Sequence, residues 1–413
     1  MEQIALNYFQ GLFSFEAKAD PSHILRMVRY KVSQAEAMVM DRRYTAEEVL
    51  SALKQIHSSK APGPDGMNAS FFKHYWPIIG DDVTKAVLEF LNEGIMTKGV
   101  NRTHIVLIPK TKNPNAMKDF RPISLCNVIY KLISKILANR LKPLLPSIIS
   151  KNQSAFVPGR LIYDNVMVAF EMVHHLKNKR QGTKGDMAIK LDLSKAFDRV
   201  EWDFLQGVMQ NMGLPSSWID RVMTCVRTVE YSILLNGSIT REFTPSRGIR
   251  QGDPLSPFLF LFCAEGLYSL LENGLQSEDL KGATVCRVGP KISHLFFADD
   301  SLLFGAATER EATHLVHILQ HYSAVSGQQI NLDKSSIFFS CNTPNNVKTR
   351  VMEILNISQV LADDKYLGMP LLIGRNKSIC FTSLRDRIWS KIKGWKNKLL
   401  SKAGQEVLIK AVV

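Results

Sequence analysis

Two adjacent aspartates, Asp299 and Asp300, lie between two apolar runs and constrain this chain more than any other feature. Residues 292–297 precede the pair and residues 301–304 follow it, and both runs have the length and residue types of short β-strands. The pair is therefore expected in the turn of a hairpin. Neighbouring carboxylates repel each other, and placing them between apolar strands costs free energy unless a cation binds there. Two solvated aspartates in a surface loop would give the same pattern.

A third carboxylate, Asp192, follows the strand-like run 187–191 and lies 108 residues before Asp300. Three carboxylates at strand ends offer the hard oxygen ligands that Mg²⁺ prefers, and they leave room for phosphate oxygens and water. The sequence thus predicts that these three side chains meet at a magnesium site. The alternative is three unrelated aspartates on the surface.

The residues around these aspartates form three ordered blocks, 192–198, 247–257 and 297–300. They resemble the A, B and C blocks of reverse transcriptases from non-LTR (LINE-type) retrotransposons, most closely those of plants. The resemblance extends over further blocks from about residue 58 to the end of the chain: residues 60–66, 108–110, 120–125, 153–160, 331–335 and 366–371.

The resemblance implies an α+β protein with the right-hand polymerase fold: fingers, an antiparallel-sheet palm and a partial helical thumb. The expected segments are a helical N-terminal connector (1–57), fingers (58–185), a palm (186–370) and a truncated, basic thumb (371–413). No glycine-rich dinucleotide or P-loop motif follows a strand, which argues against those folds.

Two local patterns predict helices in this framework. Apolar residues at helical spacing over 129–137 predict a long amphipathic helix. The D-x-x-E spacing of Asp198 and Glu201 predicts a helix that starts near Asp198, with that side chain as its cap. Metal ligation by Asp198 is the alternative.

The resemblance also implies the chemistry. Asp192, Asp299 and Asp300 would hold two Mg²⁺ ions, with Mn²⁺ as a substitute, and the Leu193 carbonyl would be a further ligand. The activity would be RNA-directed DNA polymerisation, in which dNTPs extend a primer 3′-end along an RNA template.

Two fingers cations and one aromatic residue would bind the incoming nucleotide. Lys110 and Arg121 resemble the cations that contact the triphosphate, although a solvated lysine would look the same as Lys110. Phe197 resembles the aromatic residue beneath the sugar, where a ring excludes a 2′-hydroxyl; the alternative is a core aromatic.

Two further positions are expected near the nucleotide. Gln251 and Gly252 would approach the template base and sugar, and a glycine is also needed for the turn before a helix that starts near 254–257. Lys334 is at the position of a lysine proposed to protonate pyrophosphate, or it belongs to a polar turn.

The chain is basic, with a net charge of +14 and a pI near 9.4, which favours a polyanionic partner. Residues 371–413 contain ten basic and two acidic residues and so carry +8 of this charge. One predicted helical face there is expected to contact the template–primer backbone, although a solvated surface face is the alternative. Its residues are Arg387, Lys391, Lys398 and Lys402.

Neither a membrane nor a disulfide framework is expected. The longest apolar run, 258–264, is far shorter than the ~18 residues of a spanning helix. The N-terminus lacks the pattern of a signal peptide. Six scattered cysteines without a C-x-x-C pair are expected as core residues of a protein in a reducing compartment. An intracellular, nuclear location is therefore expected for a retroelement product.

Two alternatives to an active reverse transcriptase remain open. The first is a decayed remnant that folds and binds nucleic acid without turnover. The second is an enzyme with another template, either a maturase of the group II intron type or a viral RNA-dependent polymerase. The chain has no room for an endonuclease domain and stops within a helical pattern, so it is expected to be a fragment or a truncated product.

Overall fold

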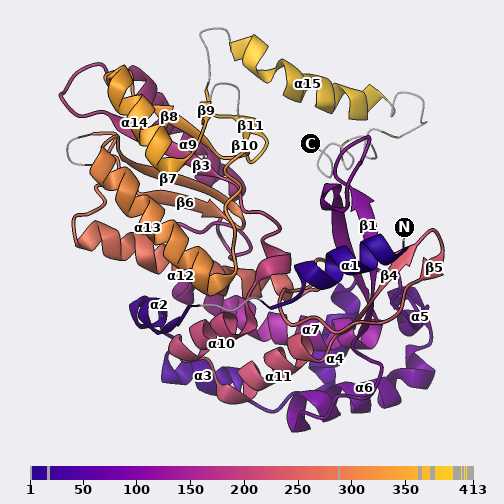
Figure 1. Cartoon of the computed structure of the whole chain (residues 1–413). Helices are drawn as coiled ribbons and strands as arrows, with labels where there is room; N and C mark the ends of the chain where they lie inside the picture. The colour runs from indigo at the N-terminus through magenta and orange to yellow at the C-terminus, as the bar shows by residue number, and fades with distance from the viewer. Residues whose placement is uncertain are drawn as a thin grey trace.

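The computed structural model describes residues 2–15, 19–286, 289–360, 365–372 and 377–393, together with residues 401, 404 and 406. Two larger β-sheets lie in separate parts of the molecule, a two-stranded sheet is formed by β10 (Lys365–Tyr366) and β11 (Met369–Pro370), and helices cover the larger sheets and fill the region below (Figure 1). The expected α+β class is confirmed.

The N-terminal segment forms four helices that pack on three different parts of the protein. They are α1 (Glu2–Leu12), α2 (Ser22–Met27), α3 (Gln34–Met40) and α4 (Ala46–Gln55). Reciprocal side-chain and backbone contacts start α3 at Ser33 and α4 at Thr45. α1 packs on the first sheet. α2 packs on α10 (Trp202–Asn211) and α12 (Ser256–Gln276), and α4 packs on α7 (Val128–Leu141).

The first sheet, called the fingers sheet below, has the strand order β2-β1-β4-β5. Its strands are β1 (Arg102–Pro109), β2 (Phe120–Cys126), β4 (Glu230–Leu235) and β5 (Ser238–Ile239). β1 pairs antiparallel with β2 and parallel with β4. This sheet therefore joins two segments that are more than 100 residues apart, one from the expected fingers and one from the expected palm.

The second sheet, called the palm sheet, has the strand order β6-β7-β3-β8-β9. Its strands are β3 (Asp186–Leu191), β6 (His294–Phe297), β7 (Asp300–Ala306), β8 (Ser336–Phe339) and β9 (Gln359–Val360). All pairs are antiparallel except β8 with β9.

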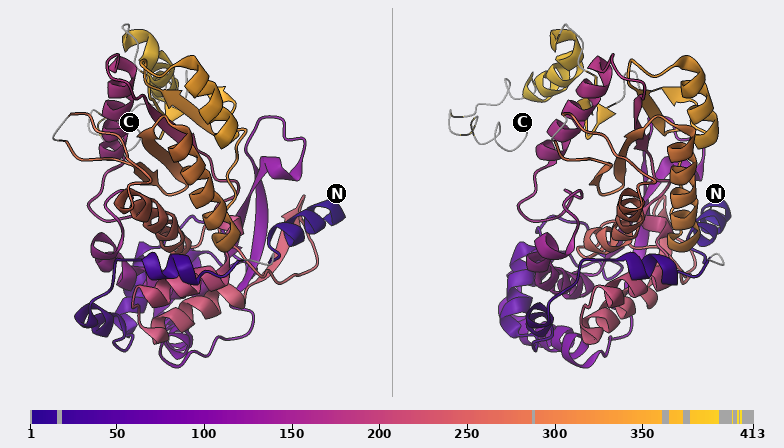
Figure 2. Two further views of the ribbon diagram at one scale, coloured as in Figure 1. Left: turned by 60° about the vertical axis from the view of Figure 1, so that its left-hand side comes forward. Right: turned by 90° about the vertical axis from the view of Figure 1, so that its left-hand side faces the viewer.

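The two faces of the palm sheet pack on different helices because alternate side chains of a strand point to opposite faces. Ala188 and Leu302 pack against α9 (Ile162–Asn178), whereas Met187 and Ile189 belong to the main core. That core also contains residues of α12 (Ser256–Gln276) and α13 (Glu309–Ser326). Figure 2 shows α9 and α13 on opposite sides of the sheet.

α12 is the central helix of this core. Among the described residues it alone has the length and composition to cross a membrane, but 83% of the apolar window is buried inside the protein. Packing against neighbouring helices and strands therefore accounts for its apolar surface.

The remaining elements connect these layers. They are α5 (Ala69–His74), α6 (Trp76–Glu93), α7 (Val128–Leu141), α8 (Leu145–Ile148), α10 (Trp202–Asn211), α11 (Ser216–Arg227), α14 (Asn345–Leu355), α15 (Lys377–Lys393), the short strands β10 (Lys365–Tyr366) and β11 (Met369–Pro370), and the 3₁₀ turns η1 (Met117–Asp119), η2 (Lys142–Leu144) and η3 (Phe197–Arg199). The helix predicted over 129–137 is α7, and most of its apolar stripe is buried.

Five cysteines have described side chains, and all five are free thiols. Cys126, Cys225 and Cys263 are buried, as expected of small core residues. The same prediction is wrong for Cys286 and Cys341, which are exposed.

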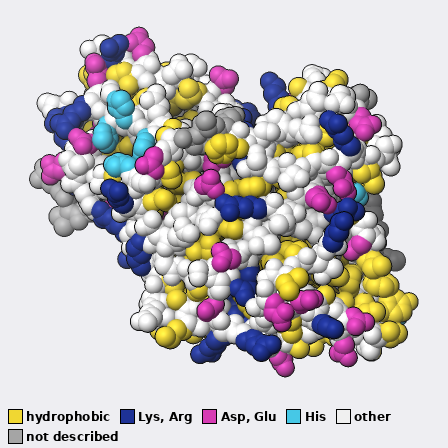
Figure 3. Space-filling view, turned by 60° about the horizontal axis from the view of Figure 1, so that its bottom comes forward, with side chains coloured by type: hydrophobic (Ala, Val, Ile, Leu, Met, Phe, Trp, Pro, Cys, Tyr) yellow, Lys and Arg dark blue, Asp and Glu magenta, His cyan; other side chains and the backbone are white. Residues whose placement is uncertain are grey.

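The surface formed by the lower helices carries basic and acidic side chains interspersed with each other (Figure 3). This face therefore lacks the one-signed charge that a nucleic-acid backbone would select.

Candidate active site

Asp299 and Asp300 lie in the hairpin between β6 and β7. Phe297 pairs with Asp300, so Ala298 and Asp299 form a two-residue turn. Ala298 has a φ of 54°, a left-handed conformation that most residues other than glycine avoid. The structure therefore places the two aspartates where the sequence predicts them.

Asp192 follows directly after β3, which pairs antiparallel with β7. Because Leu191 pairs with Ser301, the next position along β3, Asp192, faces Asp300. The backbone of Asp192 is held on both sides: its N–H donates to Ser335 Oγ at 3.2 Å, and its carbonyl accepts from Asn331 N at 2.8 Å. The three carboxylates thus gather at one end of the palm sheet, and we call them the acidic corner.

The charges of the acidic corner disfavour one another. The pKa of Asp299 is raised because surrounding protein atoms displace water and because Asp192 is nearby, although part of the side chain is exposed. The pKa of Asp300 is also raised, mainly by lost hydration and then by Asp299. A bound cation would reverse this repulsion.

The acidic corner has the oxygen donors that a divalent cation prefers. Within the described parts of the chain, no three His, Cys, Asp or Glu side chains are close enough to surround an ion by themselves. A divalent cation at the acidic corner would therefore need phosphate oxygens and water as further ligands. Leu193, the proposed carbonyl ligand, is half-buried and forms an isolated bridge with Ile330.

Three cations come near the acidic corner from two other segments. Lys110 directly follows β1, and Arg121 lies on the neighbouring strand β2, opposite Ile108. The pKa of Lys110 is lowered, first by lost hydration and then by repulsion from Lys334 and Arg121, while Asp192 opposes this shift. Arg121 likewise lowers the pKa of Asp299, against the larger raising effects. The structure therefore brings all three predicted nucleotide-binding cations close to the acidic corner.

Lys334 lies in a turn that also supports the acidic corner. Its N–H donates to Asn331 O at 3.1 Å, and its side chain is exposed. The sequence left open a cation near the nucleotide or a polar turn; the structure shows the turn, and the role near the nucleotide stays a prediction.

Phe197 lies in the 3₁₀ turn η3 beyond Asp192. Its ring is half-buried and stacks on Phe260 of α12, with ring centroids 5.0 Å apart and planes inclined by 11°. One side of the ring is therefore held by the core. A role in sugar selection stays a prediction.

The prediction that Asp198 caps a helix is wrong. α10 begins at Trp202, and Asp198 lies in η3, buried with 1% of its surface exposed. Its Oδ1 accepts a hydrogen bond from Gln251 Nε2 at 2.9 Å instead of capping backbone N–H groups. Burial raises the pKa of Asp198 to about 6, while Lys195 and the Gln251 hydrogen bond oppose the shift.

Gln251 and Gly252 lie against β2. The carbonyl of Gln251 accepts from Ser124 N at 2.8 Å. Gly252 has a φ of +109°, and a Cβ there would lie 3.1 Å from Ser124 O, so both backbone conformation and space favour glycine. The helix expected near 254–257 is α12, which begins at Ser256.

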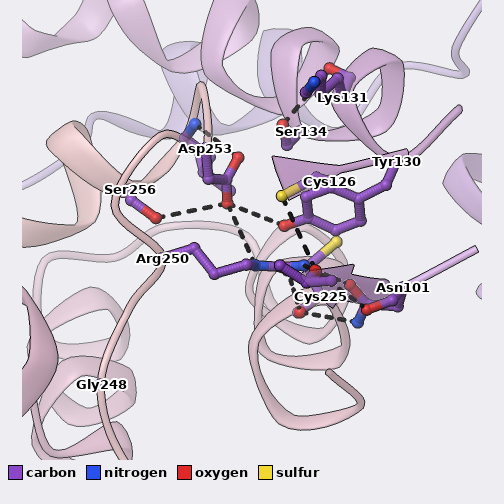
Figure 4. A network of polar contacts seen from close by, with 12 residues as sticks. Asn101, Cys126, Tyr130, Lys131, Ser134, Cys225, Gly248, Arg250, Asp253 and Ser256 are labelled. Carbon is purple, nitrogen blue, oxygen red and sulfur yellow. Dashed lines mark hydrogen bonds and ion pairs between the residues drawn. The ribbon is translucent and has the colours of Figure 1, made fainter. Parts of the chain in front are cut away.

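Arg250 of the B block forms part of the scaffold, a role that the sequence did not reveal (Figure 4). Arg250 is buried, donates to Asn101 Oδ1 at 2.6 Å and to Cys225 O at 2.7 Å, and stacks on the Tyr130 ring at 3.8 Å. The Tyr130 hydroxyl donates to Asp253 Oδ2 at 2.9 Å. The signal that could have suggested this role is an arginine three residues before an aspartate in an otherwise apolar block.

Gln153 is another functional residue that sequence reasoning missed. Its Oε1 accepts from Ala298 N at 3.1 Å and from Ala155 N at 2.9 Å, and the side chain is fully buried. Gln153 thus holds the left-handed residue of the turn that carries Asp299. Its place as the first residue of the 153–160 block was the available signal.

The predicted basic face falls only partly within the described residues. Arg387 is exposed on α15, and Lys391 lies in the same helix, whereas Lys398 and Lys402 lie outside the described residues. A groove of about 570 Å³ along α15 is lined by Phe381, Trp389 and their neighbours, and no residue of the acidic corner lines it.

Comparisons with known proteins agree with this geometry. Residues 108–371 match the family model described as "Reverse transcriptase (RNA-dependent DNA polymerase)". The "Transposon TX1 uncharacterized 149 kDa protein" of Xenopus laevis is 29% identical over 413 residues, which cover 99% of this chain and 31% of that protein. The "Retrovirus-related Pol polyprotein from type-2 retrotransposable element R2DM" of Drosophila melanogaster is 27% identical over 316 residues, covering 75% of this chain and 28% of that protein.

A shorter match involves a plant protein. The "Uncharacterized mitochondrial protein AtMg01250" of Arabidopsis thaliana is 47% identical over 68 residues, covering 16% of this chain and 56% of that protein. The chain spans about a third of the length of the two retroelement proteins above. Since the family model covers more than half of the chain, the chain belongs to the reverse transcriptase (RNA-dependent DNA polymerase) family.

Proposed function

We propose that this chain is an RNA-directed DNA polymerase that extends a primer 3′-end with dNTPs along an RNA template. The observation that carries the proposal is that Lys110 lies within electrostatic reach of Asp192, and Arg121 within reach of Asp299. Lys334 lies in the turn whose Asn331 N–H donates to the Asp192 carbonyl. A nucleotide triphosphate needs both groups, because its phosphates bind cations while its metal ions bind carboxylates.

Asp192, Asp299 and Asp300 would hold two Mg²⁺ ions, or Mn²⁺ in their place, with the carbonyl of Leu193 as a further ligand. When bound, these ions lower the pKa of the primer hydroxyl and stabilise the leaving pyrophosphate. The raised pKa values of Asp299 and Asp300 support this assignment, because lost hydration and repulsion between the carboxylates outweigh the attraction of the nearby cations Arg121 and Lys190.

The protein's own cations would position the triphosphate. Arg121 has the planar fork that binds two phosphate oxygens, and Lys110 supplies a point charge from the next strand. Lys334, held in the turn beside Asp192, would donate a proton to the pyrophosphate.

The sugar and base would contact the A and B blocks. Phe197, fixed on one side by Phe260, would exclude a 2′-hydroxyl, while Gln251 and Gly252 would lie along the nucleotide and template base. The basic face of Arg387, Lys391, Lys398 and Lys402 would contact the template–primer backbone.

The element that encodes this chain would be a non-LTR retrotransposon of the plant type, acting in the nucleus. The similarity to retrotransposable-element proteins supports the element class, and the 47% match to the Arabidopsis protein supports plant affinity.

Primer extension on poly(rA)/oligo(dT) with Mg²⁺ tests this function. The parent chain should incorporate dTTP and reject UTP, whereas Asp299→Asn should incorporate neither. Phe197→Val should raise UTP use by about 30- to 1000-fold with only modest loss of dTTP use.

Three results would contradict the proposal. Template binding without extension would identify a non-catalytic nucleic-acid-binding remnant. Preference of the parent for UTP would identify an RNA polymerase. If Phe197→Val rejects UTP as strictly as the parent, Phe197 is a core residue and the sugar is selected elsewhere.

A further inference from the structure

The B block is hydrogen-bonded through its backbone to the segment 197–200. Ile249 N donates to Phe197 O at 2.9 Å, and Gly248 N donates to Val200 O at 2.8 Å. Gly248 has a φ of +88°, and a Cβ there would lie only 2.6 Å from Asp198 O. Because only glycine permits this approach, the A and B blocks lie backbone against backbone.

One side-chain contact crosses this junction next to the proposed nucleotide site. Asp198 Oδ1 accepts from Gln251 Nε2 at 2.9 Å. Asp198 is 1% exposed, and its Oδ2 is buried without a hydrogen-bond partner among the described residues. An ionised carboxylate only accepts hydrogen bonds, so it holds the NH₂ group of Gln251 and turns the Oε1 atom away from itself.

Several charged and titratable groups surround Asp198. Lys195 and Arg199 come from its own segment, Lys110 from the end of β1, and Tyr8 from α1. The Lys195 ammonium is buried and lies 5.3 Å from the centre of the Tyr8 ring. These cations favour the carboxylate form while burial disfavours it, and the resulting pKa of about 6 leaves Asp198 ionised at neutral pH.

We propose that Asp198 is a positioning residue whose carboxylate fixes the Gln251 amide, so that Gln251 Oε1 faces a hydrogen-bond donor of the incoming nucleotide. This assignment rests on the proposed polymerase function and adds to it the residue that orients Gln251. Asp198 itself touches no substrate.

A purely structural role explains the arrangement less well. Backbone hydrogen bonds from Gly248 and Ile249 already fasten the two blocks, and Trp202 Nε1 donates to Gly248 O at 2.7 Å. A buried carboxylate with one unpaired oxygen adds a desolvation cost to a junction that is already formed. The cost is explained if the Asp198 carboxylate is needed as an acceptor that keeps the Gln251 amide in one orientation.

The test is a double-mutant cycle on primer extension with Asp198→Leu, Gln251→Leu and the double variant. Each single variant should raise the KM for dTTP by about 3- to 10-fold, the effect expected when one hydrogen bond to the nucleotide is lost. The double variant should resemble Gln251→Leu, because Asp198 acts through Gln251. Multiplied effects in the double variant would overturn the proposal.

Two further variants separate positioning from folding. Asp198→Asn resembles a protonated Asp198, because its amide can both accept from and donate to Gln251. At every pH it should therefore show the raised KM that the parent shows only below about pH 6. In the parent, KM should rise as pH falls through about 6, because a protonated Asp198 can donate and let the amide reverse; Asp198→Asn should lack this inflection. Asp203→Asn, an exposed aspartate on α10, is the matched control and should change neither value. Identical pH profiles of the parent and Asp198→Asn would overturn the proposal.

A measurement without turnover distinguishes this inference from the proposed function. The side-chain amide resonance of Gln251, identified in ¹⁵N-glutamine-labelled protein by its loss in Gln251→Leu, should titrate near pH 6 in the parent and not in Asp198→Asn. A resonance that does not respond to pH in the parent would overturn the Asp198 assignment even in an active enzyme. Absence of primer extension by a parent whose resonance does titrate would refute the polymerase function instead.

Discussion

The Arg250 network and the acidic corner differ in how far the protein itself compensates their charges. Arg250 is buried, and the protein itself supplies its partners Asn101, Cys225 and Tyr130 (Figure 4). In the acidic corner, by contrast, three carboxylates lie at the same end of the palm sheet, and two of them have raised pKa values. The fold thus compensates the buried Arg250 within the protein, whereas repulsion and lost hydration outweigh the compensation of Asp299 and Asp300.

The largest effect should follow from changing the acidic corner. Asp192→Asn should lower primer extension by about 10³-fold or more, because a metal ligand and its charge are lost. Its melting temperature should equal or exceed that of the parent, because the substitution relieves repulsion. A variant that keeps most of its activity, or that unfolds, would show that Asp192 belongs to the scaffold.

The Arg250 network should respond in the opposite sense. Arg250→Met should lower the free energy of unfolding by about 3–5 kcal/mol, because Asp253 and the other buried partners lose their cation. Urea denaturation measures this loss. Arg227→Met, which removes an exposed ion pair with Asp203, is the control and should cost less than about 1 kcal/mol. A similar loss in both variants would remove the distinction between the two regions.

Asp198 lies between these extremes, since it is buried but only half satisfied. Its folded pKa of about 6 exceeds the ordinary value of 3.8, so the folded protein binds the proton more tightly than the unfolded chain. Protonated Asp198 therefore makes its full contribution to the free energy of unfolding below about pH 3.8, and this contribution is lost as pH rises through 6. Asp198→Asn should therefore stabilise the protein by about 3 kcal/mol at pH 7 and by nothing near pH 3.5. Denaturation of both proteins across this pH range measures the difference, and a gain that does not change with pH would contradict the account.

The smallest effect is expected at Gln153, which supports the acidic corner without carrying charge. Gln153→Leu leaves Ala298 N and Ala155 N without their acceptor and should cost about 1–2 kcal/mol of stability. Primer extension should fall by about tenfold as Asp299 shifts. Gln276→Leu, an exposed change on α12, is the control for both measurements. An unchanged rate would show that the turn keeps its shape without Gln153.

The sequence predicted the features that depend on local pattern. The hairpin at Asp299, the helix over 129–137 and the helix start at Ser256 each follow from residue types within a few positions. The family resemblance also predicted the cations near the acidic corner, which no local pattern reveals.

Contacts between segments that are far apart in the sequence determine the features that local patterns did not predict. Asp198 and Glu201 have the local spacing of a helix cap, but burial beside Gln251, 53 residues away, determines the actual conformation. Arg250 pairs with Asn101 across 149 residues, and Gln153 with Ala298 across 145. The roles of these side chains depend on which segments the fold brings together, and their neighbouring residues give only an indirect signal of it.

Metal binding tests most directly the claim that the acidic corner awaits cations. Mn²⁺ would be titrated calorimetrically into the parent and into Asp300→Asn, each with dATP bound. We expect saturable binding to the parent and at least about 100-fold weaker binding to the variant, because loss of a direct ligand should weaken metal binding at least as much as loss of a residue that supports a ligand. Equal Mn²⁺ affinity in the two proteins would contradict the claim that the acidic corner binds metal.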